Sequence, residues 1–246
     1  ADYITDFESG VDALTFHPNM TSSGPVSVYR SGGASFIYTG LDNGAYQSAV
    51  IVAGLVQGAD MDIRQSLIMI GDGASETLSG QVAYENVLYG MGGDDQINGG
   101  YRDDILMGSD GADIIYGGGG RDLIYGGEGA DTFVYLSALD SAPHEFDAIA
   151  DFVSGQDRID LAMATAQGGY DNFALARFGG STFVYLGRLG ANEFEGVIQV
   201  LGEVQGADLV LGSDVGLVLY GSEANDDLRG GAGGDTPAGS GGSGGG

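Results

Sequence analysis

The chain has 246 residues, with 35 Asp and Glu against eight Arg and no Lys, so its formal net charge is −27. A field of this sign repels nucleic acids and anionic membranes and attracts divalent cations. Cysteine is absent, which excludes disulfides and thiol chemistry, and no apolar run reaches the roughly 18 residues that would predict membrane insertion.

Residues 1–70 are predicted to form a β-rich flank. Short runs rich in β-branched and aromatic residues are bounded by Gly, Asn and Ser, and they lie at Val26–Arg30, Ala34–Thr39 and Ala49–Ala53. Alternation along a strand places Phe36 and Tyr38 on one face. We expect this pair to pack in the core; the alternative is an aromatic platform for a saccharide.

Residues 71–134 are predicted to form a repeat array, and its nine-residue unit is clearest in 90–134. Two looser copies, GMGGDDQIN (90–98) and GGYRDDILM (99–107), precede three complete ones, GSDGADIIY (108–116), GGGGRDLIY (117–125) and GGEGADTFV (126–134). Gly and Asp favour a turn in the first six positions, while position eight is always bulky and apolar. One apolar residue per nine is too sparse for a helix face but suits a three-residue strand with one inward side chain. Repetition of this unit predicts a flattened solenoid.

Position six is aspartate in every copy: Asp95, Asp104, Asp113, Asp122 and Asp131. Ca²⁺ takes about six to eight oxygen ligands, and Gly-rich turns add backbone carbonyls to these carboxylates. If successive turns alternate between two sides of the roll, turns n and n+2 meet, which pairs Asp95 with Asp113, Asp104 with Asp122, and Asp113 with Asp131. Stacked carboxylates would repel one another without cations, so we expect the segment to fold only with calcium.

The chain then repeats itself over a longer distance. DYITDFESGVDAL (2–14) is similar to DAIADFVSGQDRI (147–159), and VQGADMDI (56–63) is similar to VQGADLVL (204–211). This duplication predicts a second β-rich flank over 135–220, with strands at Phe173–Phe178, Thr182–Leu186 and Val197–Leu201 and with Phe183 and Tyr185 on one face. Residues 221–238 begin a second array that is predicted to be truncated, because Pro237 occupies its apolar position. Residues 239–246 are predicted to be a flexible Gly/Ser tail.

The nonapeptide follows the calcium-binding RTX pattern G-G-x-G-x-D-x-U-x, and GADTFVYLSALDS…DAIADFVSGQDRIDL (129–161) resembles the C-terminal region of serralysin-type secreted metalloproteases. The resemblance implies an all-β fold, a calcium-binding parallel β-roll flanked by duplicated antiparallel β-strand modules. It also implies export by type I secretion. Calcium would be held by the five position-six aspartates and by the turn carbonyls of Gly108, Asp110, Gly117, Gly119, Gly126 and Glu128.

The chain departs from that family where catalysis is concerned. The zinc-binding motif H-E-x-x-H is missing, and the only histidines are His17 and His144, so the protease activity does not transfer and we predict no enzyme here. Glu76, Asn86 and Asp226 occupy position six of degenerate copies and are not assigned as ligands. Capping of the roll by Asp147, Asp151 and Asp157 as ligands stays open beside a role in turns and strand entry.

Three functions fit these patterns. The first is a secreted calcium-dependent structural module, on the surface of a bacterium or outside it, that assembles head to tail as a matrix, surface-layer, filament or adhesin protein. The second is the C-terminal secretion and folding module of a larger enzyme, such as a protease, lipase or epimerase. The third is saccharide binding by the flanks. Calcium is the predicted ligand of all three, with no nucleic acid partner.

Overall fold

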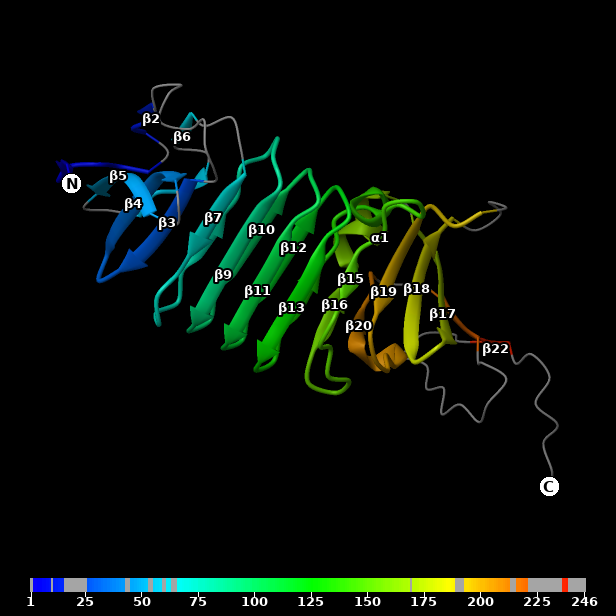
Figure 1. Ribbon diagram of the computed structural model, residues 1–246. Helices are drawn as coiled ribbons and strands as arrows, with labels where there is room; N and C mark the ends of the chain where they lie inside the picture. The colour runs from blue at the N-terminus through cyan, green and yellow to red at the C-terminus, as the bar shows by residue number, and fades with distance from the viewer. Residues whose placement is uncertain are drawn as a thin grey trace.

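The computed structural model describes residues 2–9, 11–15, 26–42, 45–52, 55–58, 61–62, 66–168, 170–188, 193–212, 216–220 and 236–238. These residues form an elongated, nearly all-β molecule (Figure 1). The strands stack side by side in one long row, with the blue strands of the first flank at one end and the yellow strands of the second flank towards the other. No helix among the described residues is long and apolar enough to cross a membrane.

A 14-stranded sheet runs along the whole molecule. Its strands, in spatial order, are β1 (Asp2–Ile4), β5 (Ala45–Val52), β4 (Ala34–Asp42), β3 (Val26–Ser31), β7 (Leu67–Ile70), β9 (Asn86–Gly92), β11 (Ile105–Asp110), β13 (Leu123–Glu128), β15 (Ala148–Ile149), β19 (Gly196–Val200), β18 (Ser181–Gly187), β17 (Asn172–Phe178), β21 (Gly216–Tyr220) and β22 (Thr236–Ala238).

A second sheet has six strands, and one further pair stands apart. The six, in spatial order, are β20 (Leu209–Val210), β16 (Arg158–Asp160), β14 (Thr132–Val134), β12 (Ile114–Gly118), β10 (Gln96–Gly100) and β8 (Thr77–Ser79). The separate pair is β2 (Leu14–Thr15) with β6 (Met61–Asp62). The flank sequences predict only strands, whereas the described residues also form a short helix, α1 (Ala162–Gly168), and the 3-10 turns η2 (Ala138–Ser141) and η3 (Gly206–Asp208).

The repeat array forms a parallel β-roll, as predicted. Strands from alternate repeats pair in parallel, so Leu106 on β11 lies beside Ile124 on β13, and Ile97 on β10 lies beside Ile115 on β12. All position-eight side chains point inward, and each is at most 2% exposed. The strands are longer than the expected three residues, because β11 and β13 continue into the glycine-containing start of the next repeat.

The two flanks have the same antiparallel core and the same connections. In the first flank β3, β4 and β5 pair antiparallel in sequence, and in the second flank β17, β18 and β19 do so. Parallel partners correspond as well: β1 lies on β5 as β15 lies on β19, and β2 lies on β6 as β16 lies on β20. The antiparallel modules are therefore duplicated at the level of strand pairing.

The aromatic pairs of the flanks do not fill the core, contrary to expectation. Phe36, Tyr38, Phe183 and Tyr185 are only partly buried, while the residues between them, Ile37 and Val184, are fully buried. The strand alternation was therefore assigned to the wrong face. Predictions for His17, Asp226, most of the second array and the tail fall outside the described residues.

Candidate metal centre

The turns of the roll bury the position-six carboxylates in two ladders. Asp95, Asp104, Asp113, Asp122 and Asp131 are each at most 1% exposed. The backbone N–H of Asp95 donates to Oδ1 of Asp113 at 2.8 Å, that of Asp104 to Oδ1 of Asp122 at 2.8 Å, and that of Asp113 to Oδ1 of Asp131 at 2.9 Å. The predicted pairing of turns n and n+2 is confirmed.

The second oxygen of each carboxylate has no hydrogen-bond partner. Oδ2 is buried and unpaired in all five aspartates, although buried polar atoms are nearly always satisfied. Each Oδ2 faces the glycine at position one of its own repeat: a Cβ on Gly90 would lie 2.2 Å from Oδ2 of Asp95 and 2.6 Å from the carbonyl oxygen of Gly108. A carboxylate oxygen and a carbonyl oxygen thus both approach the side-chain position of this glycine, which carries only a hydrogen atom.

The same convergence recurs along the roll. A Cβ on Gly99 would lie 2.4 Å from Oδ2 of Asp104 and 2.6 Å from the carbonyl oxygen of Gly117. On Gly108 the corresponding distances are 2.1 Å to Oδ2 of Asp113 and 2.5 Å to the carbonyl oxygen of Gly126. Hard oxygen atoms from carboxylates and carbonyls are the donors that Ca²⁺ prefers, so the donor set fits this ion.

Burial raises the pKa values of these carboxyl groups. The pKa of Asp95 and that of Asp131 rise to about 6, that of Asp104 to about 7 and that of Asp122 to about 8, in each case chiefly through desolvation. Repulsion between neighbouring carboxylates is a smaller cause. A cation beside Oδ2 would stabilise the ionised form that burial disfavours.

Of the predicted position-three carbonyls, those of Asp110 and Glu128 lie in strands of the 14-stranded sheet, and that of Gly119 directly follows β12 of the six-stranded sheet. Asp110 pairs with Glu128, and the carbonyl oxygen of Glu128 accepts the N–H of Gly111 at 2.8 Å. Gly119 donates its own N–H to the carbonyl oxygen of Gly100 at 3.0 Å. A role for these three carbonyls in calcium binding stays a prediction.

The ladders continue past the last repeat through residues outside the nine-residue period. Oδ1 of Asp147 accepts the N–H of Asp122 at 2.8 Å, and its buried Oδ2 has no partner within hydrogen-bond distance, although the Tyr135 hydroxyl interacts with this carboxylate. Asp157 accepts the N–H of Asp131 at 3.1 Å, but its Oδ2 already accepts the N–H of Val153. Asp151 accepts the N–H groups of Gly126 and Gly127. Of these three, Asp147 alone has the unpaired oxygen of the array aspartates.

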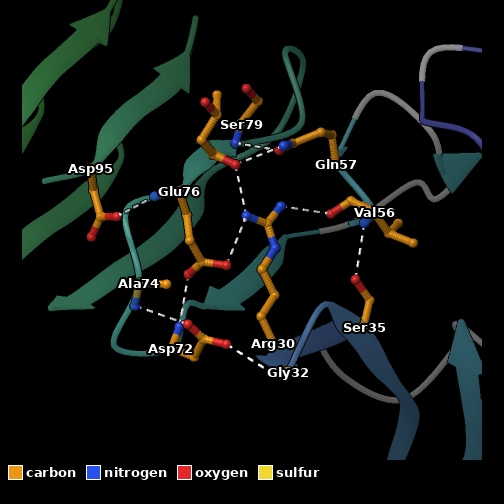
Figure 2. A network of polar contacts seen from close by, with 11 residues as sticks. Arg30, Gly32, Ser35, Val56, Gln57, Asp72, Ala74, Glu76, Ser79 and Asp95 are labelled. Atoms are coloured by element: carbon orange, nitrogen blue, oxygen red, sulfur yellow. Dashed lines mark hydrogen bonds and ion pairs between the residues drawn. The ribbon is translucent and has the colours of Figure 1, made fainter. Parts of the chain in front are cut away.

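A buried arginine at the start of one ladder was missed in the sequence. Arg30 lies 3.6 Å from Glu76 with its side chain fully buried, and Glu76 donates its N–H to Oδ1 of Asp95 (Figure 2). Only its position within an apolar strand, VSVYRS, could have marked this arginine. Among the described residues, no group of three or more Asp, Glu or His side chains is placed so that it could hold a metal ion by itself.

Comparisons with known proteins agree with this geometry. Residues 73–183 match the family model of the peptidase M10 serralysin C terminal, and residues 218–237 match that of the RTX calcium-binding nonapeptide repeat. The chain is an RTX calcium-binding β-roll protein. More particularly, its roll and the flank after it resemble the C-terminal domain of the serralysin-type secreted proteases, and its nonapeptide repeats bind calcium.

The individual relatives match over short stretches. The serralysins of Photorhabdus luminescens and of Photorhabdus sp. (strain Az29) are each 64% identical over 33 residues, which are 13% of this chain and 7% of theirs. The chain thus covers a small part of the length of these curated relatives. The solution structures of two subunits of the Azotobacter vinelandii mannuronan C5-epimerase were also matched. AlgE6R3 has 28% identity and a TM-score of 0.33, covering 57% of this chain and 80% of its own. AlgE6R2 has 24% identity and a TM-score of 0.32, covering 55% and 81%.

Proposed function

We propose that the chain is an extracellular structural module whose roll folds around calcium and whose copies join end to end. The proposed ligands are the five position-six carboxylates and the carbonyls of Gly108, Gly117 and Gly126. The observation that carries this assignment is the row of buried, unpaired Oδ2 atoms, three of them converging with a carbonyl oxygen from the repeat two positions on. Asp147 extends the row by one carboxylate.

Bound calcium supplies positive charge that two oxygens of different turns can share. In this chain the residues of turn n supply Oδ2, and those of turn n+2 supply the carbonyl and the Oδ1 that fixes the first turn. The glycine at position one leaves room for this contact, because any Cβ would occupy the same point. Calcium-dependent folding follows, because the unpaired carboxylates oppose burial until they are neutralised.

The duplicated flanks support assembly. In the second flank, β15 and β16 cap the end of the array by pairing with β13 and β14. Their counterparts β1 and β2 pair with the corresponding strands of the first flank, β5 and β6. In the 14-stranded sheet, β1 forms one edge and β22 forms the other. A second copy joined through its β22 would place an array-type strand on β1, as β13 lies on β15.

Burial differs between the two flanks in the way that this proposal requires. Ile149, Phe152 and Ile159 are at most 6% exposed where the array ends on them. Their counterparts Ile4, Phe7 and Leu14 are only partly buried. Asp12 is exposed whereas its counterpart Asp157 is buried, although each accepts a backbone N–H from the residue four positions earlier. We call the surface formed by Ile4, Phe7, Asp12 and Leu14 the amino-terminal edge.

Sedimentation velocity tests this assembly with the full chain. We expect oligomers in millimolar calcium and monomers in chelator. Asp12→Arg should weaken association roughly tenfold or more through loss of a charged hydrogen bond. Glu8→Arg makes the same charge change on an exposed side chain, and its counterpart Val153 lies 46% exposed beside the array, so this control should assemble normally. A wild-type chain that stays monomeric in calcium would contradict the proposal.

A second candidate is the C-terminal secretion and folding module of a larger secreted enzyme. The match of residues 73–183 to the serralysin C-terminal family favours it, as do the short matches to two serralysins. Fusion of the chain to a reporter, followed by assay of the medium with and without a type I exporter, tests this role. Retention of the reporter under both conditions would count against it.

Saccharide binding is a lesser candidate that rests on one feature of the second flank. Phe183, Tyr185 and Phe194 form a half-buried aromatic row, with ring centroids 6.4 Å and 5.1 Å apart. A glycan array probed in calcium would test it, and an absence of binding would remove it.

A further inference from the structure

Both ladders begin with a residue other than aspartate. Asn86 donates its N–H to Oδ1 of Asp104 at 2.6 Å, and Glu76 donates its N–H to Oδ1 of Asp95 at 2.8 Å. The two residues therefore occupy position six in the backbone of the roll. Their side chains differ from the array aspartates in that neither leaves its outer atom unpaired.

The amide of Asn86 lies where an array carboxylate has its unpaired oxygen. A Cβ on Gly80 would lie 2.7 Å from Nδ2 of Asn86 and 2.4 Å from the carbonyl oxygen of Gly99, which reproduces the convergence at Gly90 and Gly99. At the array sites two oxygens meet and repel. Here a nitrogen donor meets the oxygen and attracts it, so no cation is needed between them.

Four oxygens surround this nitrogen. Nδ2 of Asn86 lies 3.0 Å from the carbonyl of Gln81, 2.7 Å from that of Tyr84, 3.2 Å from that of Gly99 and 2.9 Å from Oδ1 of Asp104. An amide nitrogen has two hydrogens and can satisfy two acceptors fully. Nδ2 of Asn86 therefore has more oxygen neighbours than its two hydrogens can satisfy, and these neighbours resemble the all-oxygen surroundings that suit Ca²⁺.

On the other ladder the cation is an arginine. A Cβ on Gly71 would lie 2.3 Å from Oε2 of Glu76 and 2.4 Å from the carbonyl of Gly90, the same convergence again. Oε2 of Glu76 accepts the N–H of Asp72 at 2.7 Å, and Oε1 lies 3.6 Å from Nη1 of Arg30 (Figure 2). Both oxygens of this carboxylate are therefore compensated by the protein.

The first flank fixes the guanidinium in this place. Nη1 of Arg30 donates to the carbonyl of Thr77 at 2.7 Å, and Nη2 donates to that of Val56 at 3.0 Å (Figure 2). These contacts tie strand β3 to the first turn of the roll. The second flank repeats the arrangement in part, because Nη2 of its counterpart Arg177 lies 3.5 Å from the carbonyl of Val204, the counterpart of Val56.

We propose that Asn86 and Arg30 take the place of calcium at the first turn of each ladder. This inference rests on the proposed calcium sites of the array. The upstream end of the roll is then closed by the first flank itself and forms without the metal. The calcium-bound turns stack on this preformed end, and calcium sites begin at Asp95 and Asp104.

A gain of one calcium site tests the inference. Asn86→Asp puts an oxygen into the cage of four oxygens and should raise the calcium bound per full-length chain by one in equilibrium dialysis. Asn98→Asp adds the same charge on an exposed side chain of β10 and should leave the count unchanged. A folded Asn86→Asp variant that binds no more calcium than the wild type would overturn the inference, whereas a wild-type chain that binds none would overturn the proposed calcium sites.

A measurement on the wild-type chain covers the case in which Asn86→Asp fails to fold. In chelator, the backbone amides of Asp72 and Gln81, which donate to the side chains of Glu76 and Asn86, should stay protected from hydrogen exchange while those of Asp104 and Asp113 exchange rapidly. Arg30→Met should remove the protection of the Asp72 amide, because it leaves the carboxylate of Glu76 buried without a cation. Equal exchange at all four amides in the wild-type chain would overturn the inference.

Discussion

Replacement of Asp104 by Asn should raise stability without calcium and reduce the stabilisation that calcium adds. The substitution keeps an oxygen at Oδ1 to accept the N–H of Asn86 and places an amide nitrogen next to the carbonyl oxygen of Gly117. In chelator it removes a buried charge, so the free energy of unfolding should rise. It also removes a charged ligand, so the increase in the free energy of unfolding on addition of calcium should be smaller than in the wild type.

The size of both effects follows from the site. Burial raises the pKa of Asp104 from 3.8 to about 7, and at about 1.4 kcal/mol per pKa unit the cost of ionising this group at pH 7 is up to roughly 4 kcal/mol. Asn avoids that cost. A site whose free calcium is about 100 times its Kd stabilises the fold by about 2.7 kcal/mol, which the variant would lose.

Urea unfolding at pH 7, followed by circular dichroism in chelator and in millimolar calcium, measures both changes. Asp103→Asn is the matched control, because it makes the same charge change at a neighbouring side chain that is 49% exposed, and we expect it to alter stability by less than about 0.5 kcal/mol in either medium. A variant that gains no stability in chelator, or that calcium stabilises as much as the wild type, would refute the reasoning, and so would an equal response of the control.

Three further predictions concern pH, the glycine cradle and the core. Burial raises the carboxyl pKa values of Asp95 and Asp131 to about 6 and that of Asp122 to about 8, so the calcium-free roll should lose stability as the pH rises from about 4 to about 8, and calcium affinity should fall as the pH is lowered through the same range. Thermal unfolding and calorimetry at pH 5.5 and 8 measure these two trends. A calcium-free roll that is most stable at pH 8 would be inconsistent with them. Gly108→Ala would put a Cβ 2.1 Å from Oδ2 of Asp113, whereas a Cβ on Gly119 would lie 3.7 Å from its nearest neighbouring atom. Equilibrium dialysis should therefore show one fewer bound calcium for Gly108→Ala and no loss for Gly119→Ala. Ile115→Ala should cost about 2–5 kcal/mol in urea unfolding because Ile115 is fully buried, while Ile114→Ala, at a side chain 46% exposed, should cost under about 1 kcal/mol; equal losses would contradict the assigned register.

The periodic part of the molecule could be predicted from the sequence because its contacts are local and repeat. A turn and a strand every nine residues place Asp95 beside Asp113, 18 residues away, without knowledge of the rest of the chain. The duplicated flanks were visible for the same reason, since similar segments such as 2–14 and 147–159 adopt corresponding strands.

Contacts that break the period could not be predicted. Asp147 meets Asp122 at a separation of 25 residues, because the segment with η2 is inserted before the ladder resumes. Arg30 reaches the first turn from a strand that pairs far away in sequence, and no local pattern indicates its target. Asn86 has a polar amide at position six, and only the oxygens around it reveal that it replaces a cation.

Hydrogen exchange of the full chain during a calcium titration tests the central claim most directly. The account predicts that the backbone amides of Asp95, Asp104 and Asp113, which donate to the carboxylates of the next turn, are protected in millimolar calcium and exchange rapidly in chelator at pH 8. Protection of these amides that is equal with and without calcium would show that the roll forms without the metal, and would contradict the account.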